Sequence, residues 1–192
     1  NLANPMDYRW HMRALMLAMQ DWVMNAKEPP PSAYPQIGKD QLVAVEAMQL
    51  PSIPGVAKPT WIQQAFRADY GPDFATKGIV TKDPPALNGS YASLVAQVDT
   101  DGNETSGLRS PELLTPLGTY AGWNMRDAKI GSPDAIYSMV GSFIPFAKTK
   151  ADRMKSGDPR PSIEERYASK DDYLAKVDAA ARKLAQTGVI LE

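Results

Sequence analysis

The sequence predicts an α+β fold that is mainly helical, with long irregular proline-rich connections and one β-hairpin. Apolar residues recur at helical spacing near both ends of the 192-residue chain, whose length suits one domain. Clusters among the 17 prolines favour extended connections over stacked regular elements. The pair Asp101-Gly102 lies between two apolar runs, a pattern typical of a hairpin turn.

The first 27 residues predict a long apolar helix that ends near Asn25, with Asn4 or Asp7 as its N-cap. Methionines flank its apolar stripe, so more than half of its circumference is apolar. Such a helix needs a large partner surface, and we assign residues 1–27 to packing on a larger body. The stripe consists of His11, Ala14, Leu15, Ala18 and Trp22.

Residues 28–90 predict a proline-rich extended segment that wraps over that body. Pro29, Pro30 and Pro31 prevent continuation of the first helix and favour polyproline II. Within this segment we expect one short strand at residues 41–45 and a helical turn at residues 61–66.

Residues 91–130 predict the hairpin and a following glycine-containing stretch. We expect strands at residues 91–99 and 104–108 around a turn at residues 100–103. Asp99, Asp101 and Asn103 also match the opening of a calcium loop. Gly102 comes too early for such a loop, however, and no glutamate closes one of about 12 residues. Turn chemistry therefore explains these residues better than a metal site does.

Residues 131–192 predict a C-terminal helical region. We expect a short helix at residues 134–140, after Ser132-Pro133, and an apolar loop at residues 141–147. Thr149, Ser162 and Ser169 each precede an acidic residue by three positions, which indicates three capped helices. Gly188 is a natural stop for the last one.

Composition excludes several classes of function and partner. The 21 basic and 22 acidic residues give a net charge of −1, which argues against a broad nucleic-acid or anionic-membrane surface. There are no cysteines, so disulfides, thiolate metal sites and cysteine nucleophiles are excluded. No uninterrupted apolar run is long enough to span a bilayer.

No complete catalytic set is evident in the chain. The Gly-x-Ser-x-Gly elbow of serine α/β hydrolases is absent from these residues. The single histidine, His11, lies inside the first helix, where a packing role is the usual one. One histidine without cysteines is too few ligands for a transition-metal site. We therefore predict no catalytic residue, metal or cofactor among these 192 residues.

Residues 117–126 are the strongest candidate for a binding site. Gly118 and Gly122 allow close backbone approach or positive φ. We predict that Tyr120, Trp123 and Asn124 border a substrate pocket, because they combine ring surface with hydrogen-bonding groups. The alternative is that the stretch is a buried aromatic anchor under a loop.

A series of motifs, in order along the chain, resembles the C-terminal part of a bacterial α/β-hydrolase-domain family of long, secreted-type proteins. The least similar stretch is residues 36–89. The resembling motifs are residues 4–8 (Asn-Pro-Met-Asp-Tyr), 13–15, 21–23, 28–32, 34–35, 98–104 (Val-Asp-Thr-Asp-Gly-Asn-Glu), 116–120, 122–124 (Gly-Trp-Asn), 141–146, 157–162 and 164–167.

The resemblance implies a segment that completes an α/β-hydrolase fold and belongs to an ester hydrolase acting by serine acyl transfer. It also implies that the nucleophile, acid and catalytic histidine lie upstream, in a missing segment or a separate chain. A small ester substrate and a secreted or periplasmic location are further implications. The alternative hypothesis is a non-catalytic binding or interaction module.

Overall fold

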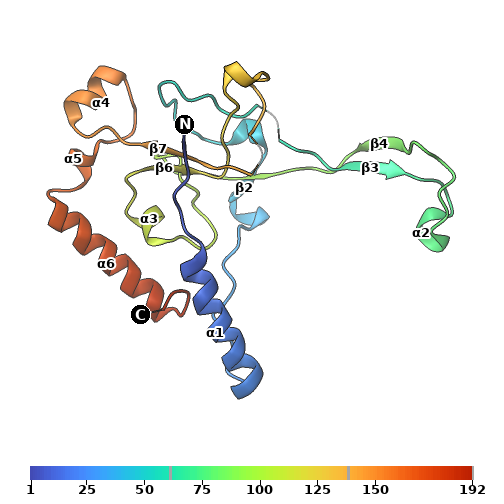
Figure 1. Ribbon diagram of the computed structural model, residues 1–192, viewed down its shortest axis with the longest axis horizontal. Coiled ribbons are helices and arrows are strands. Elements are labelled where there is room, and N and C mark those ends of the chain that lie inside the picture. Colours follow the sequence, from blue (N-terminus) through green and yellow to red (C-terminus); the bar gives the residue numbers. More distant parts are fainter. Residues whose placement is uncertain (61, 138, 192) are drawn as a thin grey trace.

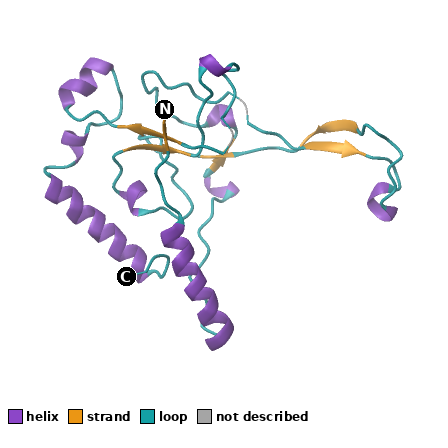
Figure 2. Ribbon diagram, in the orientation of Figure 1, coloured by secondary structure: helices purple, strands orange, loops and turns teal. Residues whose placement is uncertain are grey.

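The computed structural model describes residues 1–60, 62–137 and 139–191. A body of small antiparallel sheets and short helices carries two projections (Figures 1 and 2). One projection is the first long helix, and the other is a two-stranded arm that ends in a short helix. The fold is therefore mixed α and β, with three small sheets among the described residues rather than a single hairpin.

The centre of the body is a three-stranded sheet in the order β1-β7-β6, formed by Leu2–Ala3, Ser142–Pro145 and Gly118–Ala121. All four residues of β6 are buried. The apolar loop expected at residues 141–147 is wrong, because β7 is the middle strand of this sheet. Pro145 is tolerated there because it is the last residue of the strand, paired with Gly118.

Gly118 is required by the close approach of β6 and β7. A Cβ at this position would lie 2.5 Å from the Ile144 carbonyl oxygen and 2.6 Å from a ring carbon of Phe143. Gly122 is different, because its added Cβ would meet nothing closer than 3.9 Å. The expected close approach is therefore confirmed at Gly118 only.

The turn predicted at residues 100–103 is confirmed. Asp99 Oδ1 accepts hydrogen bonds from the N–H groups of Asp101 and Asn103, at 2.9 and 3.0 Å. The long flanking strands are wrong, because among the described residues these two segments form a single isolated bridge, Val98↔Glu104, instead of a ladder. The strand β5 (Val95–Ala96) instead pairs with β2 (Leu42–Val43), which lies within the predicted strand at residues 41–45.

The projecting arm consists of β3 (Phe66–Asp69), β4 (Ala86–Ser90) and the tip helix α2 (Phe74–Lys77). It points away from the body (Figure 1). Trp61, where the expected helical turn begins, lies outside the described residues. The rest of that expectation is wrong, since residues 62–65 are irregular and Phe66 begins β3.

The first long helix, α1, spans Arg9–Asn25, as predicted from its apolar stripe. The predicted capping by Asn4 or Asp7 is wrong, since Tyr8 precedes the helix and makes no side-chain cap. Asp7 instead accepts the Arg9 N–H at 2.9 Å and pairs with its guanidinium. Ala14 is the one buried residue of the helix.

The C-terminal region contains three capped helices, as predicted: α4 (Lys150–Ser156), α5 (Ile163–Arg166) and α6 (Lys170–Gln186). The side chains of Thr149, Ser162 and Ser169 accept the expected backbone hydrogen bonds. The longest of the three, α6, packs on α3 (Pro111–Leu114).

Three 3-10 helices complete the regular structure that the model describes: η1 (Ile37–Lys39), η2 (Val45–Ala47) and η3 (Ala128–Ile130). The helix expected at residues 134–140 is wrong over its described part, which holds a turn and the bridge Met125↔Ile136. No described helix is long and apolar enough to cross a membrane.

Arg160 ties the C-terminal helices to the central sheet. It is 2 % exposed and binds Asp158 in bidentate fashion, at 3.0 and 2.6 Å. It also donates to Thr119 Oγ1 on β6 at 2.8 Å and to the Ile144 carbonyl on β7 at 3.0 Å. Burial alone raises the pKa of Asp158, but the hydrogen bonds and charge of Arg160 outweigh burial and hold that pKa below its usual range.

A second ion pair lies beside the first. Arg166 binds both carboxylate oxygens of Asp101, and its guanidinium lies 4.0 Å from the centre of the Phe146 ring. The Arg160 guanidinium lies 5.1 Å from the same ring. We call this set the Arg160 cluster: Asp101, Thr119, Phe146, Asp158, Arg160 and Arg166.

Candidate functional site

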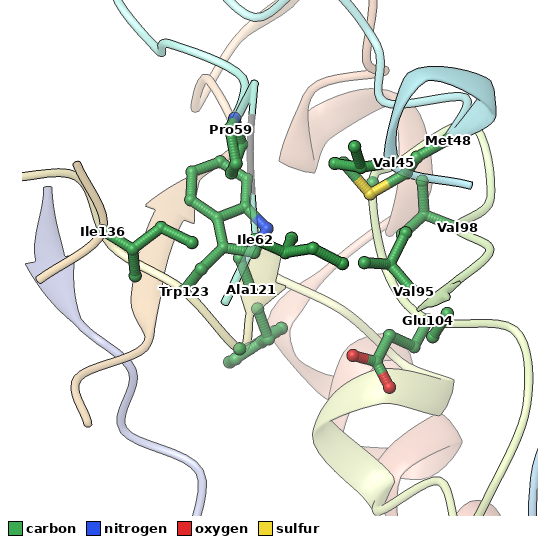
Figure 3. Close-up of a pocket in the computed structure, with 14 residues that line it drawn as sticks. Val45, Met48, Pro59, Ile62, Val95, Val98, Glu104, Ala121, Trp123 and Ile136 are labelled. Carbon is green, nitrogen blue, oxygen red and sulfur yellow. The ribbon is translucent and has the colours of Figure 1, made fainter. Parts of the chain in front are cut away.

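A pocket of about 240 Å³ lies between the β2–β5 pair and the chain that follows β6 (Figure 3). Its lining is mostly apolar, and Glu104 is the only charged side chain among the described residues that line it. The volume is below the range typical of drug-sized sites, so the pocket suits a small ligand. The apolar lining includes Val45, Met48, Ile62, Val95, Val98 and Ile136.

Trp123 is placed in this pocket by the central sheet. It follows β6 by two residues, and its carbonyl accepts a 2.7 Å hydrogen bond from the buried hydroxyl of Ser142 on β7. The Tyr137 N–H donates to the Asn124 carbonyl at 2.7 Å, which brings Ile136 alongside. The indole therefore projects from a fixed backbone into the space between Ile136 and Ile62 (Figure 3).

Glu104 follows the Asp99–Asn103 turn and lies at the edge of the same pocket (Figure 3). The residue is exposed, and its side chain forms no hydrogen bond or ion pair within the described part of the chain. The protein around the carboxylate still displaces part of its water, which raises the pKa of Glu104 above its usual range. The pocket thus combines an apolar interior with one unpaired acid.

The structure separates the three sequence-predicted pocket residues. Trp123 lines the pocket with its ring, and Tyr120 borders it from β6. Asn124 is not among the lining residues. It is 9 % exposed, its Nδ2 donates to the Asn1 carbonyl at 3.5 Å, and its buried Oδ1 has no partner in the described chain.

Tyr120 directs its ring into the core. The ring lies 4.9 Å from that of Phe143 on β7, and the residue is 7 % exposed. Burial is the main reason that the pKa of its hydroxyl rises to about 12. A hydrogen bond with the Leu117 backbone lowers this pKa in part, and the nearby Tyr173, Glu112 and Tyr167 raise it slightly.

His11 is engaged in packing. Its Nδ1 lies 2.8 Å from the Val189 carbonyl, next to the end of α6, and its Nε2 is buried without a partner in the described chain. Neither nitrogen is therefore hydrogen-bonded to a serine hydroxyl, as a catalytic base would be. The described residues also contain no group of three or more His, Asp or Glu placed to hold a metal ion.

Sequence reasoning missed Glu104 and most of the apolar wall. Glu104 enters the structural prediction only as the first residue of the second hairpin strand, at residues 104–108, although its position directly after the Asp99–Asn103 turn is a usable signal. Val45, Met48 and Ile62 come from the proline-rich segment, whose path no periodicity reveals.

A family model described as an alpha/beta hydrolase domain matches residues 1–192. No curated protein matches the chain. No solved structure matches it either. The match covers every residue of the chain, including the motifs around Trp123 and Arg160. The chain therefore belongs to the alpha/beta hydrolase domain family, and this membership supports a hydrolase-type function.

Proposed function

We propose that this chain completes the fold of an ester hydrolase that acts by serine acyl transfer. Its nucleophile, acid and catalytic histidine would lie upstream of residue 1, on the same polypeptide or on a separate chain. Residues 1–27, 28–90, 91–130 and 131–192 then form one domain that packs, through α1, on the catalytic body. The observation that carries this proposal is the unpartnered apolar surface of α1.

Helix α1 carries large apolar side chains that remain exposed to water. Met16 is 68 % exposed, Met19 64 % and Trp22 55 %. A soluble monomer rarely leaves a continuous apolar surface of this extent uncovered. The exposed large side chains of the helix are Trp10, Met12, Leu15, Met16, Leu17, Met19, Trp22, Val23 and Met24.

An α/β-hydrolase sheet is a suitable partner for that surface. Such folds cover both faces of a mostly parallel sheet with helices, each of which buries one apolar side. The sheets described here are small and antiparallel, and α1 points away from them (Figure 1). Membership of the hydrolase family supplies the reason to expect the large parallel sheet nearby.

The catalytic chemistry would also come from that body. Serine acyl transfer needs an imidazole that can reach both a hydroxyl and an acid. His11 is held by the Val189 carbonyl beside α6, so it is not available for that role. Of our three candidates for the substrate rim, Tyr120, Trp123 and Asn124, the pocket supports Trp123 best, because the Asn124 amide faces Asn1. That pocket would take part of a small ester.

Labelling with a fluorophosphonate tests the proposal. We expect the longer natural protein to be labelled at one upstream serine and to hydrolyse a p-nitrophenyl ester. The 192-residue chain alone should do neither, because it lacks the activated serine. Peptide mass spectrometry locates the label.

Stoichiometric labelling of a serine within residues 1–192 would contradict the proposal. An unlabelled and inactive natural protein would instead favour the alternative, a non-catalytic binding module.

A further inference from the structure

We propose that the pocket beside Trp123 binds a small organic cation, a molecule with an apolar body and one protonated amine, and that Glu104 supplies the counter-charge. The inference rests on the proposed function in one respect: if the pocket is the substrate rim, the substrate is an amine-bearing ester. Binding of the cation itself requires no hydrolysis.

The cavity fits the apolar body of such a ligand. Its volume of about 240 Å³ admits one ring together with a short alkyl chain. Val45, Val95, Val98 and Ile136 provide aliphatic walls, and the indole of Trp123 provides a flat aromatic one (Figure 3). A ligand ring would pack against that indole in an offset or edge-on arrangement.

The unpaired carboxylate identifies the head group. The two other acids of the same turn both have basic partners: Asp101 pairs with Arg166, and Asp99 lies 3.7 Å from Arg109. Glu104 has none within the described chain, and no lysine or arginine is among the described residues that line the pocket. A carboxylate at the mouth of an apolar cavity attracts a cation and repels an anion.

Glu104 lies close to the pocket wall, which favours selection of a cation over an anion. The carboxylate lies near the Gly122 backbone, with Oε1 3.9 Å from where a Gly122 Cβ would be, so no side chain stands between them. Its partly desolvated surroundings strengthen a charge-assisted hydrogen bond compared with one in open water. An ammonium group at this point would leave the rest of the ligand directed towards the indole (Figure 3).

Calorimetry on the intact natural protein near pH 7 tests the inference with three probes of one shape: 4-phenylbutylamine, 4-phenylbutanol and 4-phenylbutanoate. We expect the amine to bind most tightly and the carboxylate least. Glu104→Gln should weaken amine binding roughly 10- to 100-fold, which corresponds to the loss of a charged hydrogen bond. It should leave alcohol binding nearly unchanged.

Two further variants separate charge from shape. Glu46→Gln makes the same chemical change at an exposed position outside the pocket and should leave amine affinity unchanged. Trp123→Leu should weaken the amine and the alcohol by similar factors, because both use the indole wall. Circular dichroism of each variant establishes that it is folded.

Equal affinity for amine and alcohol would overturn the inference, and so would unchanged amine binding by folded Glu104→Gln. Failure of the natural protein to bind the amine would also overturn it. Amine binding that depends on Glu104 in a protein without esterase activity would support the inference and refute only the proposed ester chemistry.

Discussion

The Arg160 cluster and α1 differ in how well their side chains are partnered within the chain. The cluster buries Asp101, Asp158 and Arg160 and partly buries Arg166, and each charge has its partner inside the chain. Helix α1 exposes most of its large apolar side chains and buries only Ala14. The charges of the cluster are thus paired with one another, whereas the apolar side chains of the projecting helix α1 remain exposed to water.

The difference shows which part of the fold is self-sufficient. A buried ion pair is stable only when its geometry and additional hydrogen bonds offset the cost of desolvation. Arg160 meets that condition through Asp158, Thr119 and two backbone carbonyls. Nothing in the described chain does the same for Met16, Met19 or Trp22, which is why we propose that α1 packs on a surface beyond these residues.

The largest expected effect is the loss of Arg160. We expect Arg160→Met to lower the free energy of unfolding by about 3–5 kcal/mol, because Asp158 is left buried without its cation. The loss should be similar in the 192-residue chain and in the longer protein that we propose, since every partner lies within the chain. Urea unfolding monitored by circular dichroism measures both.

Lys77→Ala is the matched control, since Lys77 pairs with Asp73 in an exposed i,i+4 arrangement on the arm. It should change stability by no more than about 0.5 kcal/mol. If Arg160→Met lowered the free energy of unfolding as little as Lys77→Ala does, the Arg160 cluster would not be the self-sufficient part of the fold that the comparison with α1 requires.

The second effect should depend on context. Full burial of a large apolar side chain stabilises by about 1.5–3 kcal/mol. Leu15, Met19 and Trp22 are 39, 64 and 55 % exposed, so roughly half of that gain, about 2–5 kcal/mol for the three, is still unrealised. The triple substitution to glutamine should therefore destabilise the longer protein by about this amount and the isolated chain by much less.

The isolated chain should also reveal the uncovered surface directly. We expect it to bind a hydrophobic dye, to dimerise through α1 or to aggregate, and the triple glutamine variant should do so less. Light scattering and dye fluorescence measure this. A monomeric, dye-silent parent chain with a cooperative melt would show that α1 needs no partner.

The smallest expected effect concerns acid. Hydrogen bonds from the Ser162 backbone and hydroxyl, followed by Arg153, lower the pKa of Glu165 from 4.5 to about 2. A lowered folded-state pKa means that the stabilisation is fully present above 4.5 and is lost as the pH falls towards 2. Glu165→Gln should therefore flatten the fall in unfolding free energy over this range, measured in urea at stepped pH.

Asp7 at the start of α1 is the comparison for Glu165. The hydrogen bond from Arg9 lowers its pKa to about 2 as well. Asp7 and Arg9 are two residues apart, so part of their attraction persists in the unfolded chain. The hydrogen bonds from Ser162 to Glu165 form the capping box of α5, so they require the folded helix, and Arg153 lies 12 residues away. Asp7→Asn should consequently alter the acid limb less than Glu165→Gln, and the reverse order would count against this distinction.

The sequence by itself determined the features that depend on near neighbours. The apolar stripe of α1, the caps at Thr149, Ser162 and Ser169 and the Asp99–Asn103 turn all follow from contacts within a few residues. Trp123 was recognisable as a site candidate because a large ring between polar residues and glycine is locally conspicuous.

Only the tertiary structure decided the features that join distant segments. Residues 141–147 read as a loop, yet β7 is the central strand because β1 and β6 supply its hydrogen bonds from positions far away in the sequence. Asn124 matched a pocket residue in type, yet its amide faces the Asn1 backbone. Glu104 was predicted to begin a hairpin strand, yet among the described residues it is the one charged group that lines the pocket, beside an apolar wall from η2, β5 and Ile136. Burial and long-range strand pairing depend on which distant segments come into contact, and local periodicity does not predict those contacts.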